Sequence, residues 1–216
     1  MKKLIIYGTG LIAEVAEFYF RTDSIYQVGA FTNAGEFIRE DQFNGMPILA
    51  FEELEKTCPP SEYDIFIALG YSKTNQVRQQ RFFEARQKGF VCATYISSRA
   101  MYYGTPVGSN CFILENNVIQ PFVTIKDNVT LWSGNHLGHH SKIGSHSFIS
   151  SHVVVSGGCD IGENCFLGVN STLRDNIKLG NFVVVGSGAV VMKDCEERCV
   201  VQPTGSTYRL INRDII

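Results

Sequence analysis

The stretch VSGGCDIGENCFLGVNSTLRDNIKLGNFVVVGSGAVV, residues 155–191, carries an aliphatic residue at every sixth position. The same period extends back to Val107 without a break. The aliphatic positions are Val107, Ile113, Ile119, Ile125, Leu131, Leu137, Ile143, Ile149, Val155, Ile161, Leu167, Leu173, Leu179, Val185 and Val191. A repeat of six residues is typical of a parallel β-helix. The sequence therefore predicts that the C-terminal half forms such a coil.

Two other positions of the repeat fit this fold. Glycine often follows the aliphatic residue, and we expect it to tolerate the corner dihedrals of the coil; these glycines are Gly108, Gly138, Gly144, Gly162, Gly168, Gly180 and Gly186. The residue four places after the aliphatic one is mostly small, with Ile177 the largest. Three units should close one coil, so eighteen residues return the chain to the same place one strand spacing higher, roughly 4.8 Å.

The seven cysteines do not suggest a disulfide framework or a zinc site. Their number is odd and no Cys-x-x-Cys occurs, which argues against both. Four of them, Cys111, Cys159, Cys165 and Cys195, occupy the small position of the repeat. We expect them to act as small buried hydrophobic residues.

The N-terminal half alternates short apolar runs with helical patterns. This alternation predicts βαβ units and a parallel sheet, as in a Rossmann-like α/β domain. Strands are expected at 2–7, 26–31, 63–69 and 90–96, and helices at 11–21, 51–56 and 73–88. The resulting division is an α/β domain over 1–97, a β-helix over 105–195 and a C-terminal tail over 196–216.

Composition narrows the functional classes. The formal net charge is -2, and no basic stripe suggests nucleic-acid binding. No segment approaches the roughly 20 apolar residues of a membrane span. Gly8 and Gly10 interrupt the N-terminal apolar run, which is too short for a signal peptide. We therefore expect a cytoplasmic protein that binds neither nucleic acid nor membrane.

A glycine loop follows the first strand. Gly8, Thr9 and Gly10 lie between that strand and a helix, which is typical of a loop that binds phosphate. The acidic residue expected about 20 positions later for NAD is missing, and Thr32 and Asn33 stand there instead. The pattern argues against an NAD dehydrogenase and leaves two alternatives, a phosphate site or a structural turn.

All five histidines lie between residues 136 and 152. His140, His146 and His152 are six residues apart, so they should occupy equivalent corners that point in different directions. This spacing argues against a metal cluster within one chain, and we predict no metal site there. A metal site between subunits remains an alternative.

His139 lies one residue before this series, at a corner. Gly157 follows eighteen residues later, so it should lie beside His139 one coil away. An exposed imidazole can take a proton from an attacking amine or hydroxyl. An unobstructed backbone N–H at Gly157 can bind the oxyanion that develops during acyl transfer. The alternative is a solvated corner histidine.

Three segments carry a resemblance to a known family: IIYGTGLIAE (5–14), GHHSKIG (138–144) and CDIGENCFLGVNS (159–171). With the segment IALGYSKTNQVRQ (67–79), they resemble the NeuD/PglD-type sugar acyltransferases over nearly the whole chain. These bacterial enzymes acetylate nucleotide-linked amino sugars with acetyl-CoA. The resemblance implies a left-handed β-helix and a homotrimer with sites between subunits.

The resemblance also assigns roles by position. His139 falls on the catalytic base, and His140 stands where the family often has a carboxylate that orients it. The implied acetyl-CoA contacts are Gly157, Gly168, Val169, Gly186 and Ser187. The implied contacts to the substrate are Gly8, Thr9, Gly10, Thr32, Asn33, Gly70 and Tyr71. Two departures stand out: Phe148 replaces a second histidine of some members, and VQPTGSTYR (201–209) replaces a Gly-x-Pro-Ala-Lys type ending.

The function expected from these features is direct transfer of acetyl from acetyl-CoA to the amine of a UDP- or dTDP-linked amino sugar, for surface polysaccharide or glycan synthesis. O-acetylation of a sugar requires the same base and is the nearest alternative. A metalloenzyme of the γ-carbonic-anhydrase kind and a non-catalytic nucleotide-sugar-binding protein are the others.

Overall fold

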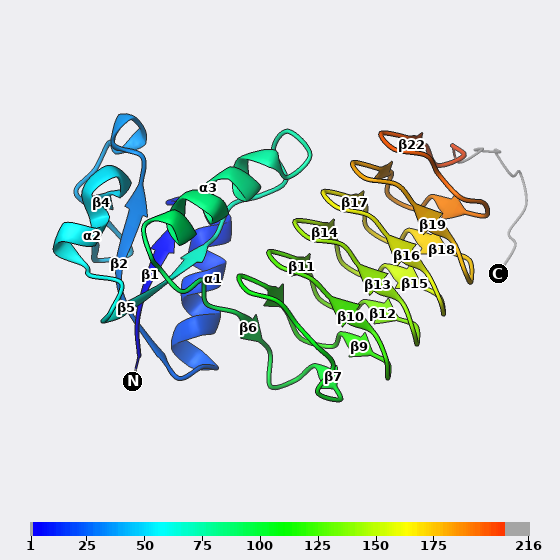
Figure 1. Cartoon of the computed structure of the whole chain (residues 1–216), viewed down its shortest axis with the longest axis horizontal. Coiled ribbons are helices and arrows are strands. Elements are labelled where there is room, and N and C mark those ends of the chain that lie inside the picture. Colours follow the sequence, from blue (N-terminus) through cyan, green and yellow to red (C-terminus); the bar gives the residue numbers. More distant parts are fainter. Residues whose placement is uncertain (1, 206–216) are drawn as a thin grey trace, which may run out of the picture.

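The computed structural model describes residues 2–205 and contains an α/β domain followed by a long β-helix (Figure 1). The sheet of the α/β domain has the strand order β3-β4-β2-β1-β5, and all its pairs are parallel except β3 with β4. The elements are β1 (Lys2–Tyr7), α1 (Leu11–Thr22), β2 (Tyr26–Asn33), a 3₁₀ turn (Gly35–Phe37), β3 (Gln42–Phe43), β4 (Met46–Ala50), a 3₁₀ turn (Phe51–Glu53), α2 (Leu54–Thr57), β5 (Tyr63–Ile67) and α3 (Gln76–Gln87).

The interior strand β1, which lies between β2 and β5, explains this arrangement. Residues 4–7 of β1 are buried on both faces, which is why the run is continuously apolar. Ala13, Ala16 and Phe20 of α1 belong to the core on one face, with Leu4 and Ile6. Phe82 and Ala85 of α3 belong to the core on the other face.

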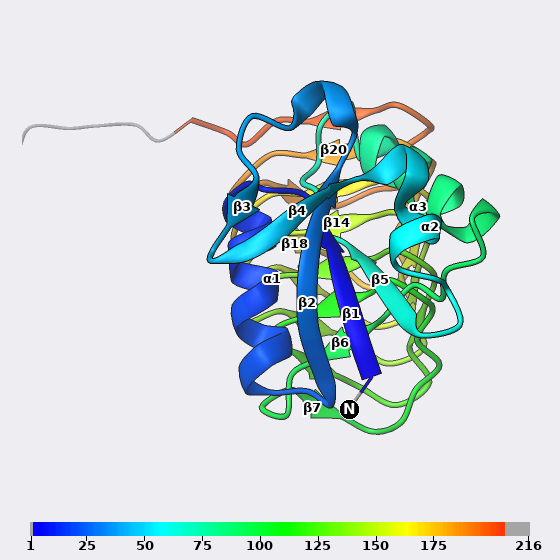
Figure 2. The same cartoon turned by 90° about the vertical axis from the view of Figure 1, so that its left-hand side faces the viewer.

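The β-helix has three parallel sheets, which we call its first, second and third faces (Figures 1 and 2). The first face contains β6 (Tyr95–Ile96), β8 (Phe112–Ile113), β11 (Thr130–Leu131), β14 (Phe148–Ile149), β17 (Phe166–Leu167), β20 (Val184–Val185) and β22 (Val200–Val201). The second contains β7 (Met101–Tyr102), β9 (Val118–Ile119), β12 (His136–Leu137), β15 (Val154–Val155), β18 (Thr172–Leu173) and β21 (Val190–Val191). The third contains β10 (Thr124–Ile125), β13 (Lys142–Ile143), β16 (Asp160–Ile161) and β19 (Lys178–Leu179).

The eighteen-residue coil is confirmed by the strand register. Leu131 pairs with Ile149, Leu137 with Val155, and Ile143 with Ile161. The aliphatic residues from Ile113 to Val191 are buried in one continuous core with most of the small residues. Cys111, Cys159 and Cys165 are buried there, whereas Cys195 is partly exposed. The fold class, an α/β domain plus a parallel β-helix, is as predicted.

The β-helix sheets extend beyond the predicted range 105–195. Strands β6 and β7 pair on its faces, and β22 extends the first face at the other end. The expected strand at 90–96 is therefore split: Cys92 forms a single bridge to Ile65 of the α/β domain, and Tyr95 donates its N–H to Cys111. Of the predicted tail, residues 206–216 lie outside the described residues.

The predicted role of the corner glycines was wrong. Positive φ angles occur instead three places after the aliphatic residue, at Asn110, Asn116, Phe122, Asn128, Gly134, His140, His146, His152, Gly158, Asn164, Asn170, Asn176, Phe182 and Gly188. The glycines that follow the aliphatic residue are needed for space, because the next coil lies against them. A Cβ on Gly162 would lie 2.7 Å from the carbonyl carbon of Gly180 and 2.8 Å from the nitrogen of Asn181.

Helix α3 docks the α/β domain on one corner of the β-helix. Arg78 is 1% exposed, and its guanidinium donates to the carbonyl and side-chain oxygens of Asn128 and to the carbonyl of His146. Asn75 donates to the carbonyls of Asn164 and Cys165. Lys73, Thr74 and Asn75 have positive φ, so α3 begins at Gln76 rather than at 73. This docking fixes which face of the β-helix the α/β domain covers.

We expect Gly162→Ala to destabilise the protein by about 1–3 kcal/mol, because the added methyl must displace the backbone of the next coil. Gly188→Asn is the matched control, since Gly188 has φ 72° and open space around it, and asparagine occupies the same slot in other coils. Urea unfolding of both variants measures the difference. Equal stability of the two would contradict the assigned close approach of the coils.

Candidate active site

His139 lies between β12 and β13, at the corner where the second and third faces meet. Its side chain is exposed. Its backbone N–H donates to the side-chain oxygen of Gln120 at 2.9 Å, which ties the corner to the preceding coil. The position therefore presents an imidazole to solvent on a rigid backbone.

Gly157 provides the space in which this imidazole lies. A Cβ on Gly157 would lie 2.8 Å from Cε1 and 2.9 Å from Nε2 of His139. Gly157 has no positive φ and is the only glycine at this position in the fifteen repeats, so the backbone does not require it. A Cβ on Gly134 would likewise lie 2.6 Å from Cε1 of His152, but Gly134 also has a φ of 80°, which Gly157 does not share. The glycine at 157 is therefore specific to the ring of His139.

His140 interacts with His139 directly. The two Nδ1 atoms are 3.1 Å apart, and the ring planes are at 85° to each other. The ring of Phe122, one coil before, lies 4.7 Å from that of His140. Phe122 and Gln120 were not among the predicted site residues, although the eighteen-residue period places both beside this corner.

The N–H group predicted to bind the oxyanion has a partner in this structure. The N–H of Gly157 donates to Asp175 Oδ1 at 3.0 Å, and the N–H of Gly158 donates to the carbonyl of His139 at 2.8 Å. Asp175 lies eighteen residues after Gly157, so the period places it beside this glycine. Gly157 also provides the space for the ring of His139.

Of the five residues expected to bind acetyl-CoA, Gly157 lies beside His139 and the other four lie on another corner. Gly168, Val169, Gly186 and Ser187 follow β17 and β20, where the first and second faces meet. Gly168 and Val169 lie on one coil, and Gly186 and Ser187 lie at the same place on the next. A Cβ on Gly168 would lie 2.6 Å from the nitrogen of Ser187. Val169 and Ser187 are exposed. The second face separates this corner from His139 and Gly157.

Two of the other histidines differ sharply in exposure. His146 is 3% exposed beneath α3 and has its Nδ1 2.9 Å from the side-chain nitrogen of Asn128. Burial, together with the positive charge of Arg78, lowers the pKa of His146 to about 4. His146 therefore cannot substitute for a histidine that touches acetyl-CoA, whereas His152 is exposed. Phe148 is buried and packs against Tyr71.

Three predicted substrate residues line one groove at the carboxyl ends of β1 and β5. This groove, of about 500 Å³, is lined by Gly10, Leu11, Ile12, Ala68, Leu69, Gly70, Tyr71 and Ser72. Tyr71 is 54% exposed, and its ring lies 4.6 Å from that of Phe166 on the first face. We call this the loop groove. Gly8 beneath it is buried with φ 120°, and a Cβ there would lie 3.0 Å from the carbonyl oxygen of Ala68.

Thr9 and Asn33 lie beside a neighbouring hollow, whereas Thr32 does not face solvent. Asn33 donates to Thr9 Oγ1 at 3.4 Å, and Thr9 lines a hollow of about 290 Å³ with Phe37, Ile38, Arg39, Glu40, Gln42, Phe43 and Ile48. Thr32 is fully buried and donates its hydroxyl to the carbonyl of Leu49 at 2.8 Å. The predicted substrate contact of Thr32 is therefore wrong, because β2 turns this side chain inward.

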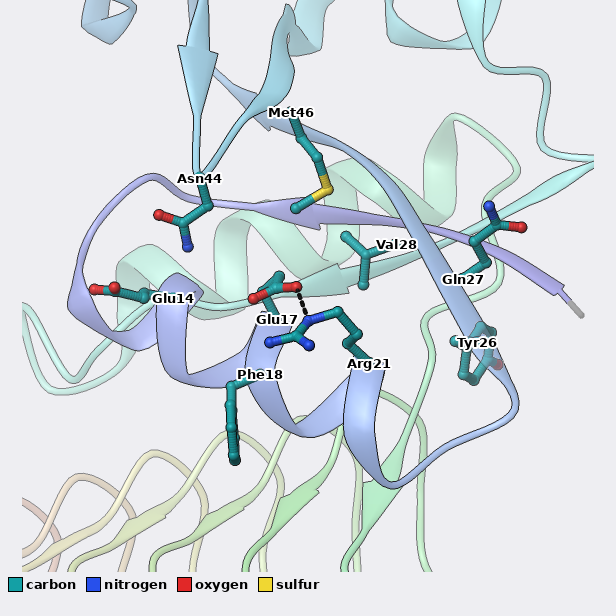
Figure 3. Close-up of a pocket in the computed structure, with 9 residues that line it drawn as sticks. All are labelled: Glu14, Glu17, Phe18, Arg21, Tyr26, Gln27, Val28, Asn44 and Met46. Carbon is teal, nitrogen blue, oxygen red and sulfur yellow. Dashed lines mark hydrogen bonds and ion pairs between the residues drawn. The ribbon is translucent and has the colours of Figure 1, made fainter.

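A larger hollow, of about 670 Å³, lies between α1 and the hairpin of β3 and β4 (Figure 3). Its side chains include the ion pair of Glu17 and Arg21, at 2.8 Å, and the apolar Val28 and Met46. None of the predicted site residues lines it. Gly10 and Tyr71 border the loop groove instead, so this larger hollow is not the predicted substrate site.

Across residues 2–205 the structure gathers no set of three or more His, Cys, Asp or Glu side chains able to hold a metal ion. No helix within those residues has the length and apolar character needed to cross a membrane.

The β-helix matches a known family, and the whole chain shares its fold with solved structures. Residues 122–157 and 158–193, which lie within the predicted repeats, match the family model described as bacterial transferase hexapeptide (six repeats). No curated protein matches the chain by sequence.

Three solved structures illustrate the shared fold. The acetyltransferase domain of PglB from Neisseria gonorrhoeae is 23% identical, with a TM-score of 0.83 over 94% of this chain and 100% of that one. PerB from Caulobacter crescentus, solved with CoA and GDP-perosamine, is 21% identical, with a TM-score of 0.82 over 95% and 98%. WeeI from Acinetobacter baumannii is 17% identical, with a TM-score of 0.65 over 93% and 96%. These structures confirm the predicted fold class, a left-handed β-helix with an N-terminal α/β domain.

The buried His146 predicts a stability that depends on pH. Its pKa is about 4 in the folded protein and about 6.5 in an unfolded chain. Only the unfolded chain binds a proton between these values, so stability should fall as the pH drops from about 6.5 toward 4. His146→Asn, which suits the positive φ of 64°, should reduce this loss in urea unfolding at pH 7.5 and 5. His152→Asn is the exposed control, and an equal loss in all three proteins would contradict the assignment.

Proposed function

We propose that this protein transfers the acetyl group of acetyl-CoA to the amine of a nucleotide-linked amino sugar, with His139 as general base. The observation that carries the proposal is the exposed imidazole of His139 held over Gly157, a glycine that only this ring requires. PglB and PerB support the choice of reaction, because their solved complexes contain acetyl coenzyme A and CoA with GDP-perosamine.

The α/β domain is proposed to hold the nucleotide part of the substrate. The loop groove lies at the N-terminus of α1, where Gly10 is exposed and a Cβ would meet nothing within 4 Å. Backbone N–H groups and the helix dipole at such a terminus favour a diphosphate. The neighbouring hollow next to Thr9 offers apolar walls from Phe37, Phe43 and Ile48 for a base. UDP and dTDP are the nucleotides proposed, and GDP is the alternative that PerB suggests.

The active site is proposed to lie between two subunits. In one chain, the α/β domain covers the first face, where Tyr71 packs on Phe148 and Phe166. His139 lies at the corner between the other two faces, which is opposite the first face of a triangular coil. A sugar held in the loop groove therefore lies across the prism from His139 of the same chain. The His139 corner of a neighbouring subunit supplies the base instead.

The second face is proposed as the contact that brings the subunits together in a homotrimer. Its outward side chains include Met101, Val154 and Val190, which are 56%, 38% and 58% exposed. The third face instead exposes Lys142, Asp160 and Lys178. An exposed apolar face beside a charged one is typical of a protein–protein interface. Acetyl-CoA is proposed to lie along Gly168, Val169, Gly186 and Ser187, which border this same face.

The reaction itself should depend on His139. With UDP-, dTDP- and GDP-linked 4-amino sugars and acetyl-CoA, we expect coenzyme A release and an N-acetylated product by mass spectrometry. His139→Asn should lower kcat by roughly 10²- to 10⁴-fold, the usual contribution of a general base. Gly157→Ala should also lower kcat, because its methyl displaces the ring of His139.

The controls separate this proposal from its alternatives. Both variants should keep the mass of the wild-type oligomer in light scattering, since neither residue belongs to the core. Acetyl transfer to matched hydroxy sugars with none to the amino sugars would show O-acetylation instead. Full activity of His139→Asn would show that another group is the base.

A further inference from the structure

We infer that His140 is a positioning residue, which accepts a hydrogen bond from Nδ1–H of His139 and thereby leaves Nε2 of His139 free to act as the base. This inference rests on the proposed function. It starts from the distance of 3.1 Å between the two Nδ1 atoms. Between two neutral imidazoles at this distance, one nitrogen must donate and the other must accept.

Only one of the two arrangements suits a base. If Nδ1 of His139 donates, its Nε2 carries a lone pair and can accept a proton. If His140 donates, Nε2 of His139 already carries a hydrogen and cannot. A histidine that acts as a base commonly has its tautomer set by the partner of its other nitrogen.

The backbone does not explain a histidine at position 140. This position has φ 61°, and the same slot in other coils holds Asn, Gly or Phe as well as His. The ring of Phe122 lies 4.7 Å from the ring of His140, at 36°. The N–H of His140 is bonded to Pro121 of the same coil as Phe122. The ring of His140 therefore packs on Phe122 of the preceding coil, and its Nδ1 points at Nδ1 of His139.

Within residues 2–205, no carboxylate accepts a hydrogen bond from the ring of His139. Asp175, the acidic residue nearest in the stack, accepts the N–H of Gly157 at 3.0 Å. Neither imidazole forms an ion pair among the described residues. Gln120 is bonded to the backbone of His139 and carries no charge. Among the side chains of residues 2–205, only that of His140 is bonded to the ring of His139.

The proton movements then balance. The neutral amine attacks the thioester carbonyl carbon, the N–C bond forms and the C–S bond breaks. The proton of the amine goes to Nε2 of His139 and from there to the coenzyme A thiolate. Throughout, Nδ1–H of His139 donates to Nδ1 of His140. When His139 is protonated, the same hydrogen bond joins its imidazolium to the neutral ring of His140.

The test uses substitutions that the positive φ of position 140 tolerates. His140→Gly removes the acceptor, and Gly134, Gly158 and Gly188 occupy the same slot elsewhere. We expect kcat to fall roughly 10- to 100-fold, as for other partners that orient a histidine, with KM changed less than about threefold. His140→Asn restores an acceptor and should recover most of the loss. Phe182→Gly, at the equivalent slot of the corner between the third and first faces, should leave kcat unchanged.

Two further readouts distinguish positioning from a merely structural role. In His140→Asp the carboxylate stabilises the protonated base, so the acidic limb of the pH–rate profile should move to higher pH. Nitrogen-15 NMR of labelled histidine at pH 8 should show His139 with its hydrogen on Nδ1, and His140→Gly should lose this preference.

The outcomes separate the two proposals. If His139→Asn is fully active, the base is misassigned and the proposed function is affected. If His139 is required but His140→Gly keeps the wild-type kcat, pH profile and tautomer, only the positioning role is overturned.

Discussion

The stacking of coils one strand spacing apart is the constraint on which the rest of this structure depends. Because residue i lies beside residue i+18, every side chain is packed against its equivalents on the neighbouring coils. The interior therefore accepts only aliphatic and small side chains, and the corners accept only residues that tolerate positive φ or close contact. The same constraint builds the candidate site, since it brings Gly157 of the following coil against His139 and Phe122 of the preceding coil against His140.

The second structural element is the docking of the α/β domain on one corner. The residues of that corner, Asn110, Asn128, His146 and Asn164, form a ladder of buried polar groups that bond to one another and to the α/β domain. Arg78 is buried against carbonyl and amide oxygens with no carboxylate partner among them. Loss of one of these oxygen partners would leave part of a buried charge without a hydrogen bond, which would destabilise the folded protein. The docking therefore holds the loop groove on one side of the coil and leaves the apolar second face uncovered.

The sequence predicted the fold because both halves obey short periods. The six-residue period identified the core of the β-helix and the eighteen-residue coil. The patterns of the first half located β1, α1, β2, β5 and α3 within a few residues, but they predicted neither β3 nor β4. The errors have local causes. Strands β6 and β7 lack the six-residue pattern, so their pairing with β8 and β9 could not be recognised. The need for glycine after the aliphatic residue arises from contact with the next coil, which no local pattern reveals.

The candidate site was predictable only in part. The period places Gly157 beside His139 and Asp175 beside Gly157, but the hydrogen bond itself depends on the rotamer of Asp175, which the sequence does not encode. The burial of Thr32 depends on which face of β2 meets the sheet core, and the burial of His146 depends on where α3 docks. Tyr71 was expected near the substrate, and its stacking on Phe148 and Phe166 explains how the groove is fixed to the first face.

The central claim is that acetyl transfer needs the loop groove of one subunit and His139 of another. Co-expression of His139→Asn with Gly10→Asp, whose carboxylate repels a diphosphate without crowding its surroundings, tests it most directly. Each variant alone should be inactive. In mixed oligomers, a shared site is intact when one subunit supplies a normal groove and its neighbour supplies a normal His139. With equal amounts of the two variants, half of the subunits have each feature, so about one quarter of the sites should work. Mixed oligomers with no more activity than the two variants assembled separately would contradict the account.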